Sequence, residues 1–178
     1  MDFSSALEAG SISSTEALSL FDSLEAIDTD FMLGAWRGAG FPTDHPADGL
    51  LESYNWYGKN FDSSEQVHPL IHTTASGKKV SLNPIFMLPL VGALGRGSLP
   101  RAPIISKLLG YIMPLFSTKK GRARLRMIEY RGKSSATMAY DHLAINDVFR
   151  KVDDNTLLGI MDLKGMAAPF FFVLRREP

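Results

Sequence analysis

Residues Gly34–Gly38 read GAWRG, and we expect this stretch to form the first strand of a mainly β fold. A helix signature precedes it over Ser13–Ile27. Ser13 can cap the N-terminus of this helix, and Glu16, three residues later, can complete a capping box. The helix is expected to end near Asp28–Asp30. Its apolar residues recur at three- and four-residue spacing and so form one buried face: Ala17, Leu20, Phe21 and Leu24.

The second half of the chain has the pattern of a β-meander. In Arg122–Arg131, Ala123 and Leu125 alternate with arginines, so one face of the strand points inward and the other to solvent. Further strands at about ten-residue spacing are typical of a sandwich or barrel rather than of βαβ units. These predicted strands are Ser135–His142, Ala144–Lys151, Thr156–Lys164 and Pro169–Arg176.

A second helix is predicted after Asp48, which can cap its N-terminus. Its apolar stripe would run as far as Phe61, with Gly58 weakening the end. A strand is the alternative for this segment because it contains the strand-prone residues Tyr54 and Trp56. The spacing of the apolar residues favours the helix.

The middle of the chain is expected to contain a strand pair and an apolar insertion. Val67–Thr74 and Lys78–Met87 are predicted as strands joined by a turn at Ser76–Gly77. The insertion Pro84–Phe116 is rich in proline and glycine, and short helices are expected over Ile104–Phe116. The last strands are apolar on both faces and need cover on both. We expect the insertion to cover them, as a lid or as a dimer interface.

Composition and charge exclude several classes of function. The chain of 178 residues is expected to be a single domain, 1–178, and its nineteen basic and nineteen acidic residues argue against nucleic acid as a partner. It has no cysteine, which excludes disulfides and thiolate metal sites. We predict no metal and no cofactor. The first residues show no secretory signal, and Pro84–Phe116 is too interrupted to span a membrane. A cytoplasmic protein without integral membrane association is therefore expected.

These motifs together resemble a known family. Residues 34–75 are similar to the family named for its GXWXG motif, and residues 121–178 resemble the domain of unknown function that accompanies it. The runs that carry the resemblance, besides GAWRG, are Phe41–Thr43, His45–Pro46, Asp48–Glu52, Ala123–Gly132, Phe149–Asp153 and Met161–Gly165. The resemblance implies a single antiparallel lipocalin-like β-barrel, because the GxW of lipocalins also lies on a first strand after a short N-terminal helix.

The resemblance also implies how one end of the barrel is closed. In lipocalins the tryptophan of the first strand closes that end, and an arginine from the last strand lies across it. Here Trp36 would take the first role and Arg175 or Arg176 the second. We expect a structural cation–π contact rather than a ligand contact, so that a ligand enters at the other end. The resemblance brings no catalytic mechanism with it.

Tyr140, Asp141 and His142 are the first candidates for chemistry. Strand geometry puts Tyr140 and His142 on one face and Asp141 on the other. If the face of Met138 points inward, a phenol and an imidazole enter an apolar cavity and can transfer protons. If the opposite face points inward, Asp141 becomes a buried base with a raised pKa. The alternative to both is a polar strand end in solvent.

His45 and His72 are the other candidate acid–base groups. His45 lies in a loop with Asp44 and Asp48, whose order matches no metal pattern, and a turn explains this loop better. His68 and His72 are expected on one strand face, about 13 Å apart. That separation is too large for the two to share a metal by themselves.

Three functions fit these features. The first is the binding of a small hydrophobic molecule inside the barrel. The second is a cofactor-independent enzyme, such as an isomerase, lyase or hydrolase, that acts on an apolar substrate through the candidate acid–base residues. The third is a homodimeric interaction protein with a filled barrel. Register decides which strand face points inward. The lining expected for the first function is Met138, Tyr140, Leu157, Met161, Phe170 and Phe172.

Overall fold

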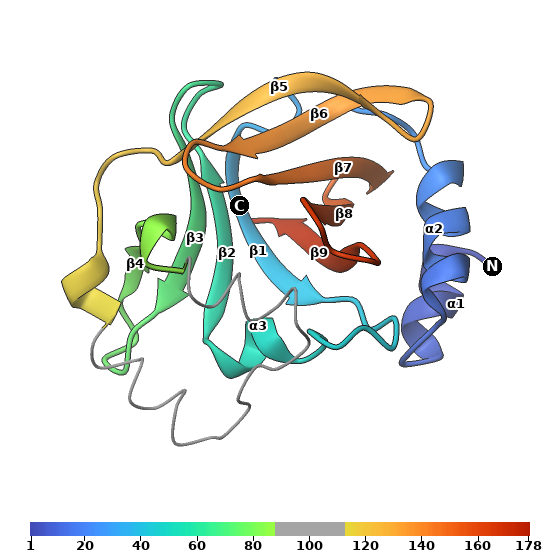
Figure 1. Ribbon diagram of the computed structural model, residues 1–178, viewed down its shortest axis with the longest axis horizontal. Helices are drawn as coiled ribbons and strands as arrows, with labels where there is room; N and C mark the ends of the chain where they lie inside the picture. The colour runs from blue at the N-terminus through green and yellow to red at the C-terminus, as the bar shows by residue number, and fades with distance from the viewer. Residues whose placement is uncertain (88–112) are drawn as a thin grey trace.

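The strands of the molecule form one antiparallel sheet that closes into a ring (Figure 1). The computed structural model describes residues 1–87 and 113–178. Around the ring the order is β2-β1-β9-β8-β7-β6-β5-β3, pairing of β2 with β3 completes it, and β4 extends β3 outside the ring. The expected mainly β, barrel-like fold is confirmed. The strands are β1 (Gly34–Gly40), β2 (Trp56–Phe61), β3 (Val67–Thr73), β4 (Lys79–Ser81), β5 (Ala123–Tyr130), β6 (Lys133–Tyr140), β7 (Ile145–Asp153), β8 (Thr156–Leu163) and β9 (Phe170–Arg176).

The C-terminal meander is present as predicted. β5 and β6 pair along their whole length, from Ala123 opposite Tyr140 to Tyr130 opposite Lys133. The joining residues Arg131 and Gly132 have φ angles of 52° and 75°, as the tight turn of a two-residue hairpin requires. From β5 to β9, each strand begins and ends within two residues of its predicted bounds.

Two N-terminal helices, α1 (Phe3–Glu8) and α2 (Ser14–Ser23), cover the outside of the meander (Figure 1). The capping box of Ser13 and Glu16 is present, but α2 ends at Ser23 rather than near Asp28. The two helices cover the outer face of the doubly apolar strands. Most of the insertion Pro84–Phe116, which was expected to cover them, lies outside the described residues. The apolar residues of the helices share one cluster with those strands: Ala6, Ile12, Ala17, Leu20, Phe21, Phe41, Val148, Leu158, Ile160, Phe171 and Val173.

One end of the barrel is closed by Trp36, as expected from the family resemblance. Arg176, which lies opposite Trp36 in the ladder, has its guanidinium carbon 4.2 Å from the centre of the Trp36 ring. The same guanidinium donates hydrogen bonds to the carbonyls of Leu33 and Phe31 at 3.0 and 2.8 Å. Trp36 Nε1 donates to the carbonyl of Met32 at 2.7 Å. Arg176, and not Arg175, therefore seals this end.

The predicted second helix is wrong beyond Ser53. α3 covers only Leu50–Ser53 and has Gly49, not Asp48, at its N-cap. Asp48 instead accepts hydrogen bonds from two backbone amides of the preceding loop. The residues from Trp56 to Phe61 form β2, because this segment is needed to pair β1 with β3 and close the ring. The strand pairing that closes the sheet therefore outweighs the helical spacing of the apolar residues in this segment.

The strand predicted over Lys78–Met87 is shorter than expected. β4 ends at Ser81, and the chain continues through a bridge from Leu82 to Ser117 and two short 3-10 helices, η1 (Pro84–Met87) and η2 (Met113–Phe116). The greater part of the predicted insertion, 88–112, lies outside the described residues. Within those that are described, no helix has the length and apolarity to cross a membrane.

Candidate functional site

A charged side chain lies inside the barrel: Lys59, on β2, is only 4% exposed. Its Nζ atom donates to Oδ2 of Asp147 at 2.7 Å and to the carbonyl of Pro69 at 3.3 Å. Asp147 comes from β7 and is 2% exposed. Ionic groups are rarely buried to this extent unless they are paired. The pair is therefore the first candidate for a functional site.

Local strand geometry turns both side chains inward. Lys59 lies opposite the inward-pointing Trp36, and register shifts on both sides of Gly58 break the alternation of β2. Because of these bulges, Trp56 and Lys59 are both buried although they are three residues apart. Asp147 shares a strand face with Phe149. Phe149 belongs to the apolar cluster inside the barrel, which we call the interior cluster and which also contains Trp36, Met138, Leu157 and Phe172.

Aromatic rings surround the ammonium group of Lys59. Its Nζ atom lies 5.3 Å from the ring centre of Trp56, 5.8 Å from that of Tyr140 and 5.1 Å from that of Phe172. These contacts stabilise the cation through the ring quadrupoles. Burial raises the pKa of the Asp147 carboxyl, and the Lys59 charge and hydrogen bond oppose that rise. Burial and the charge of Asp147 raise the pKa of Tyr140 well above 10.0.

His72 lies near this pair on β3 and is 2% exposed. Its Nδ1 is 2.9 Å from the carbonyl oxygen of Tyr54. A carbonyl only accepts, so Nδ1 carries the hydrogen and Nε2 of the neutral ring is an acceptor. Burial lowers the pKa of His72 to about 4; the Tyr54 contact opposes this shift, and the Lys59 charge adds to it. His72 is therefore neutral at pH 7.

Three buried polar atoms of this region have no hydrogen-bond partner among the described residues. They are Nε2 of His72, Nε1 of Trp56 and Oδ1 of Asp147. A buried polar atom without a partner costs about 1–3 kcal/mol. One hydrogen-bond donor and two acceptors are therefore left without partners, in the described part of the chain, beside the Lys59–Asp147 pair. We call the five residues Lys59, Asp147, Trp56, Tyr140 and His72 the interior polar site.

The predicted ligand lining lies on the inward face, which is the face of Met138. Met138, Leu157 and Phe172 belong to the interior cluster, and Tyr140 and Met161 pack against it. Phe170 is an exception, since it belongs to a separate small cluster with Ala47, Leu50 and Tyr54. Of the predicted acid–base residues, only Tyr140 and His72 come together with Lys59 in the interior polar site.

The other candidate residues lie elsewhere. Asp141 and His142 are in the exposed loop after β6, where Asp141 pairs with Arg124 at 3.2 Å. His45 Nδ1 accepts from the amide of Ala47 at 3.0 Å, so His45 orders its own loop. Burial lowers the pKa of His45, and Asp48 opposes this shift. His68 does not share the environment of His72, since it contacts Ser81 and Asp62.

Sequence reasoning missed Lys59 and Asp147. Lys59 was hidden by the helix predicted over its segment. Asp147 lies on the same strand face as the apolar residues Ile145 and Phe149. A single charged residue at an inward position of a buried strand is the sequence pattern that indicates it. Arg150, on the opposite face of β7, is also buried. Its guanidinium donates hydrogen bonds to the carbonyls of Tyr130 and Lys133, so among the described residues it is paired with backbone groups and not with a carboxylate. It lies 4.9 Å from the ring of Phe21.

Metal ligands do not gather in this site. Among the residues the structure describes, no group of three or more His, Asp or Glu side chains has a geometry that could hold a metal ion. The interior polar site is therefore built from one ion pair, one neutral imidazole and the polar edges of aromatic rings.

Comparisons with known proteins place the site across two matched regions. The model described as GXWXG protein matches residues 19–77, and the model of the domain of unknown function DUF4334 matches residues 121–176. The chain is also similar to a protein from Thermomonospora curvata known from a crystal structure. The two are 31% identical, the match covers 98% of this chain and 95% of that one, and the TM-score is 0.71. No curated protein matches the sequence. Lys59 lies in the first matched region and Asp147 in the second.

Proposed function

This chain belongs to the family of GXWXG proteins that also carry DUF4334, and we propose that its barrel binds a small, mainly apolar molecule. The apolar part of that molecule lies among the inward side chains of the barrel, and its polar end meets the interior polar site. The observation that carries the proposal is the set of three buried polar atoms without partners beside a buried ion pair.

If the barrel interior served stability alone, we would expect apolar residues in place of the buried pair Lys59 and Asp147. Replacing a buried ion pair by apolar residues of similar volume is often neutral or stabilising. A chain that keeps Lys59 and Asp147, and also leaves Trp56 Nε1 and His72 Nε2 unpaired, retains groups that a bound molecule can satisfy. Pairing them on binding removes the cost of burying them alone.

The unpaired atoms also suggest the polar group of the ligand. Trp56 Nε1 only donates, whereas His72 Nε2 and Asp147 Oδ1 accept when His72 is neutral and Asp147 is ionised. An uncharged hydroxyl group both accepts and donates, so it matches this set. A carboxylate would meet the charge of Asp147 at close range and is disfavoured. A medium-chain alcohol is therefore the model ligand.

The test compares 1-decanol with decane and decanoate by competition against the apolar dye Nile red. We expect 1-decanol to displace the dye at the lowest concentration, and the Lys59→Met/Asp147→Leu double variant to bind alcohol and alkane alike. Asp141→Asn, which changes an exposed carboxylate, is the control and should bind as the wild type does. If Nile red and all three probes fail to bind the wild type, or if the double variant keeps the preference for alcohol, the proposal is wrong.

A second candidate function follows from His72. Its Nε2 is a buried, neutral acceptor, which is the property of a general base. With an apolar ketone bound, Nε2 would take a proton from the carbon beside the carbonyl. The electron pair of that C–H bond would move to the carbonyl oxygen, where the Lys59 ammonium would stabilise the enolate. Return of a proton to carbon completes the exchange.

This enzymatic alternative has its own test. 2-Decanone incubated with the protein in D2O would exchange its α-hydrogens, measured by NMR, faster than in buffer. We expect His72→Phe to lose the acceleration and His142→Phe, on the exposed loop, to retain it. Equal exchange with and without the wild-type protein would reject catalysis of this kind while leaving the binding proposal intact.

A further inference from the structure

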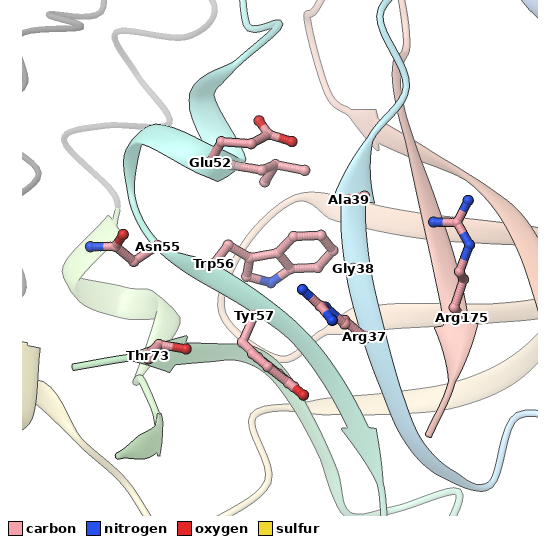
Figure 2. Close-up of a pocket in the computed structure, with 10 residues that line it drawn as sticks. Arg37, Gly38, Ala39, Glu52, Asn55, Trp56, Tyr57, Thr73 and Arg175 are labelled. Atoms are coloured by element: carbon pink, nitrogen blue, oxygen red, sulfur yellow. The ribbon is translucent and has the colours of Figure 1, made fainter. Parts of the chain in front are cut away.

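A hollow lies where strands β1 and β2 part (Figure 2). Their ladder runs from Gly34 opposite Phe61 to Arg37 opposite Gly58. Beyond that pair, β1 continues beside β9 only, and β2 continues beside β3. Glu52 of α3 bridges the gap by accepting a hydrogen bond from the Gly40 amide at 2.8 Å. The result is a fork in the barrel wall, and its hollow has a volume of about 500 Å³.

Trp56 forms the inner wall of this fork. Its ring lies directly against Gly38, where an added Cβ would come within 2.0 Å of a ring carbon. The second glycine of the GXWXG motif is therefore needed for this close approach. Trp56 lines the fork and also lies 5.3 Å from Nζ of Lys59, so this one side chain belongs to both the fork and the interior polar site. The other members of the interior polar site do not line the fork.

Two arginines line the outer side of the fork, and the Arg37 guanidinium is turned toward the ring of Tyr57, 6.0 Å from its centre (Figure 2). Arg37 of β1 lies directly opposite Arg175 of β9, and both are exposed and line the hollow. Like charges at directly opposed positions of a sheet are destabilising. No carboxylate of the described residues forms an ion pair with either guanidinium, although the charge of Arg37 is among the causes that lower the pKa of Glu177. Glu177 is occupied by Lys79 and by the hydroxyl of Tyr57.

The remaining lining is mixed. Asn55 and Thr73 carry neutral hydrogen-bonding groups, and Leu51 and the Trp56 ring are apolar. Figure 2 shows Glu52 on the α3 side of the hollow, away from Arg175. The hollow therefore has a cationic side, an acidic side and an apolar floor, and its volume is in the range of small-molecule sites.

We propose that the fork binds the oxyanion of a small organic molecule, a phosphate or carboxylate group, between Arg37 and Arg175. The anion relieves the repulsion between the two guanidinium groups, each of which can donate two parallel hydrogen bonds to it. The organic part of the molecule lies toward Trp56 and Leu51. Neither arginine belongs to the interior polar site. The proposal for the fork therefore does not depend on whether the interior binds an alcohol.

Titration calorimetry at constant ionic strength, set with sodium chloride, tests the proposal. Phenyl phosphate and benzoate are the organic probes, and inorganic phosphate is the probe without an organic part. We expect saturable binding of at least one organic probe, weakened at least tenfold in both Arg37→Gln and Arg175→Gln. Arg124→Gln, which removes an exposed arginine of β5, is the matched control and should bind as the wild type does.

The relative affinities of the two organic probes show whether the fork prefers a phosphate or a carboxylate. Tighter binding of phenyl phosphate than of benzoate assigns the site to phosphates, and the reverse order assigns it to carboxylates. The proposal is overturned if neither organic probe binds at constant ionic strength, or if Arg124→Gln weakens binding as much as Arg175→Gln. Displacement of Nile red by 1-decanol, measured on the same variants, reports on the interior separately and should not change.

Discussion

The Nζ atom of Lys59 lies 2.7 Å from Oδ2 of Asp147 in the barrel interior, and both side chains are almost fully removed from solvent. The two residues are 88 positions apart in the chain. Their ion pair connects the GXWXG region to the C-terminal meander. Because each charge is buried, each depends on the other for its stability.

Removing one partner of this pair should destabilise the protein more than removing both. Lys59→Met leaves a buried carboxylate without its counter-charge, which costs about 3–5 kcal/mol in comparable pairs. In Lys59→Met/Asp147→Leu no charge remains, so the free energy of unfolding should recover to within about 1 kcal/mol of wild type. Urea denaturation at pH 7 measures both values. A double variant as unstable as Lys59→Met would show that the charges themselves are not the cause.

The stability of the protein should decrease below pH 6.5 because of His72. Its pKa in the folded state is about 4, against 6.5 for an ordinary histidine. Between these values the unfolded state binds more protons, so this contribution is complete above pH 6.5 and is lost as the pH falls toward 4. The slope should approach about 1.4 kcal/mol per pH unit. Urea denaturation from pH 4 to 7 should show a smaller slope in His72→Gln and an unchanged one in His142→Gln.

Gly38→Ala should destabilise the protein because the new methyl group would overlap the Trp56 ring. Overpacking of this kind costs about 1–3 kcal/mol. The same substitution made in a Trp56→Leu background should cost less, because the smaller side chain leaves space for the methyl group. Thermal unfolding of the four proteins completes a double-mutant cycle. Equal costs in the two backgrounds would mean that Gly38 is required for some reason other than contact with Trp56.

Arg176→Lys should weaken the closed end of the barrel. A lysine cannot reproduce both hydrogen bonds to the Phe31 and Leu33 carbonyls. We expect a loss of about 1–3 kcal/mol and stronger quenching of Trp36 fluorescence by acrylamide, measured in a Trp56→Phe background. Arg175→Lys is the matched control, since Arg175 points outward, and should change stability by less than about 0.5 kcal/mol. Similar losses for both would contradict the assignment of Arg176 as the seal.

Local patterns were sufficient to predict much of the fold. The strands of the meander alternate in sequence as they do in the structure, and the capping box of Ser13 and Glu16 starts α2 where expected. These features depend on neighbours within a few residues, so the sequence displays them directly. The inward face of Met138 could not be chosen in advance, because a shift by one residue reverses both faces of a strand.

By itself, the sequence determined the strands of the meander, and its resemblance to a known family implied the barrel and the position of Trp36 at the closed end. Only the tertiary structure decided that the segment after Trp56 is a strand, that α1 and α2 cover the meander, and that Lys59 meets Asp147. The physical reason is that a buried charge is tolerated only with a partner, and this partner is distant in sequence. Local spacing records which residues can be buried together, but the closure of the ring determines which of them meet.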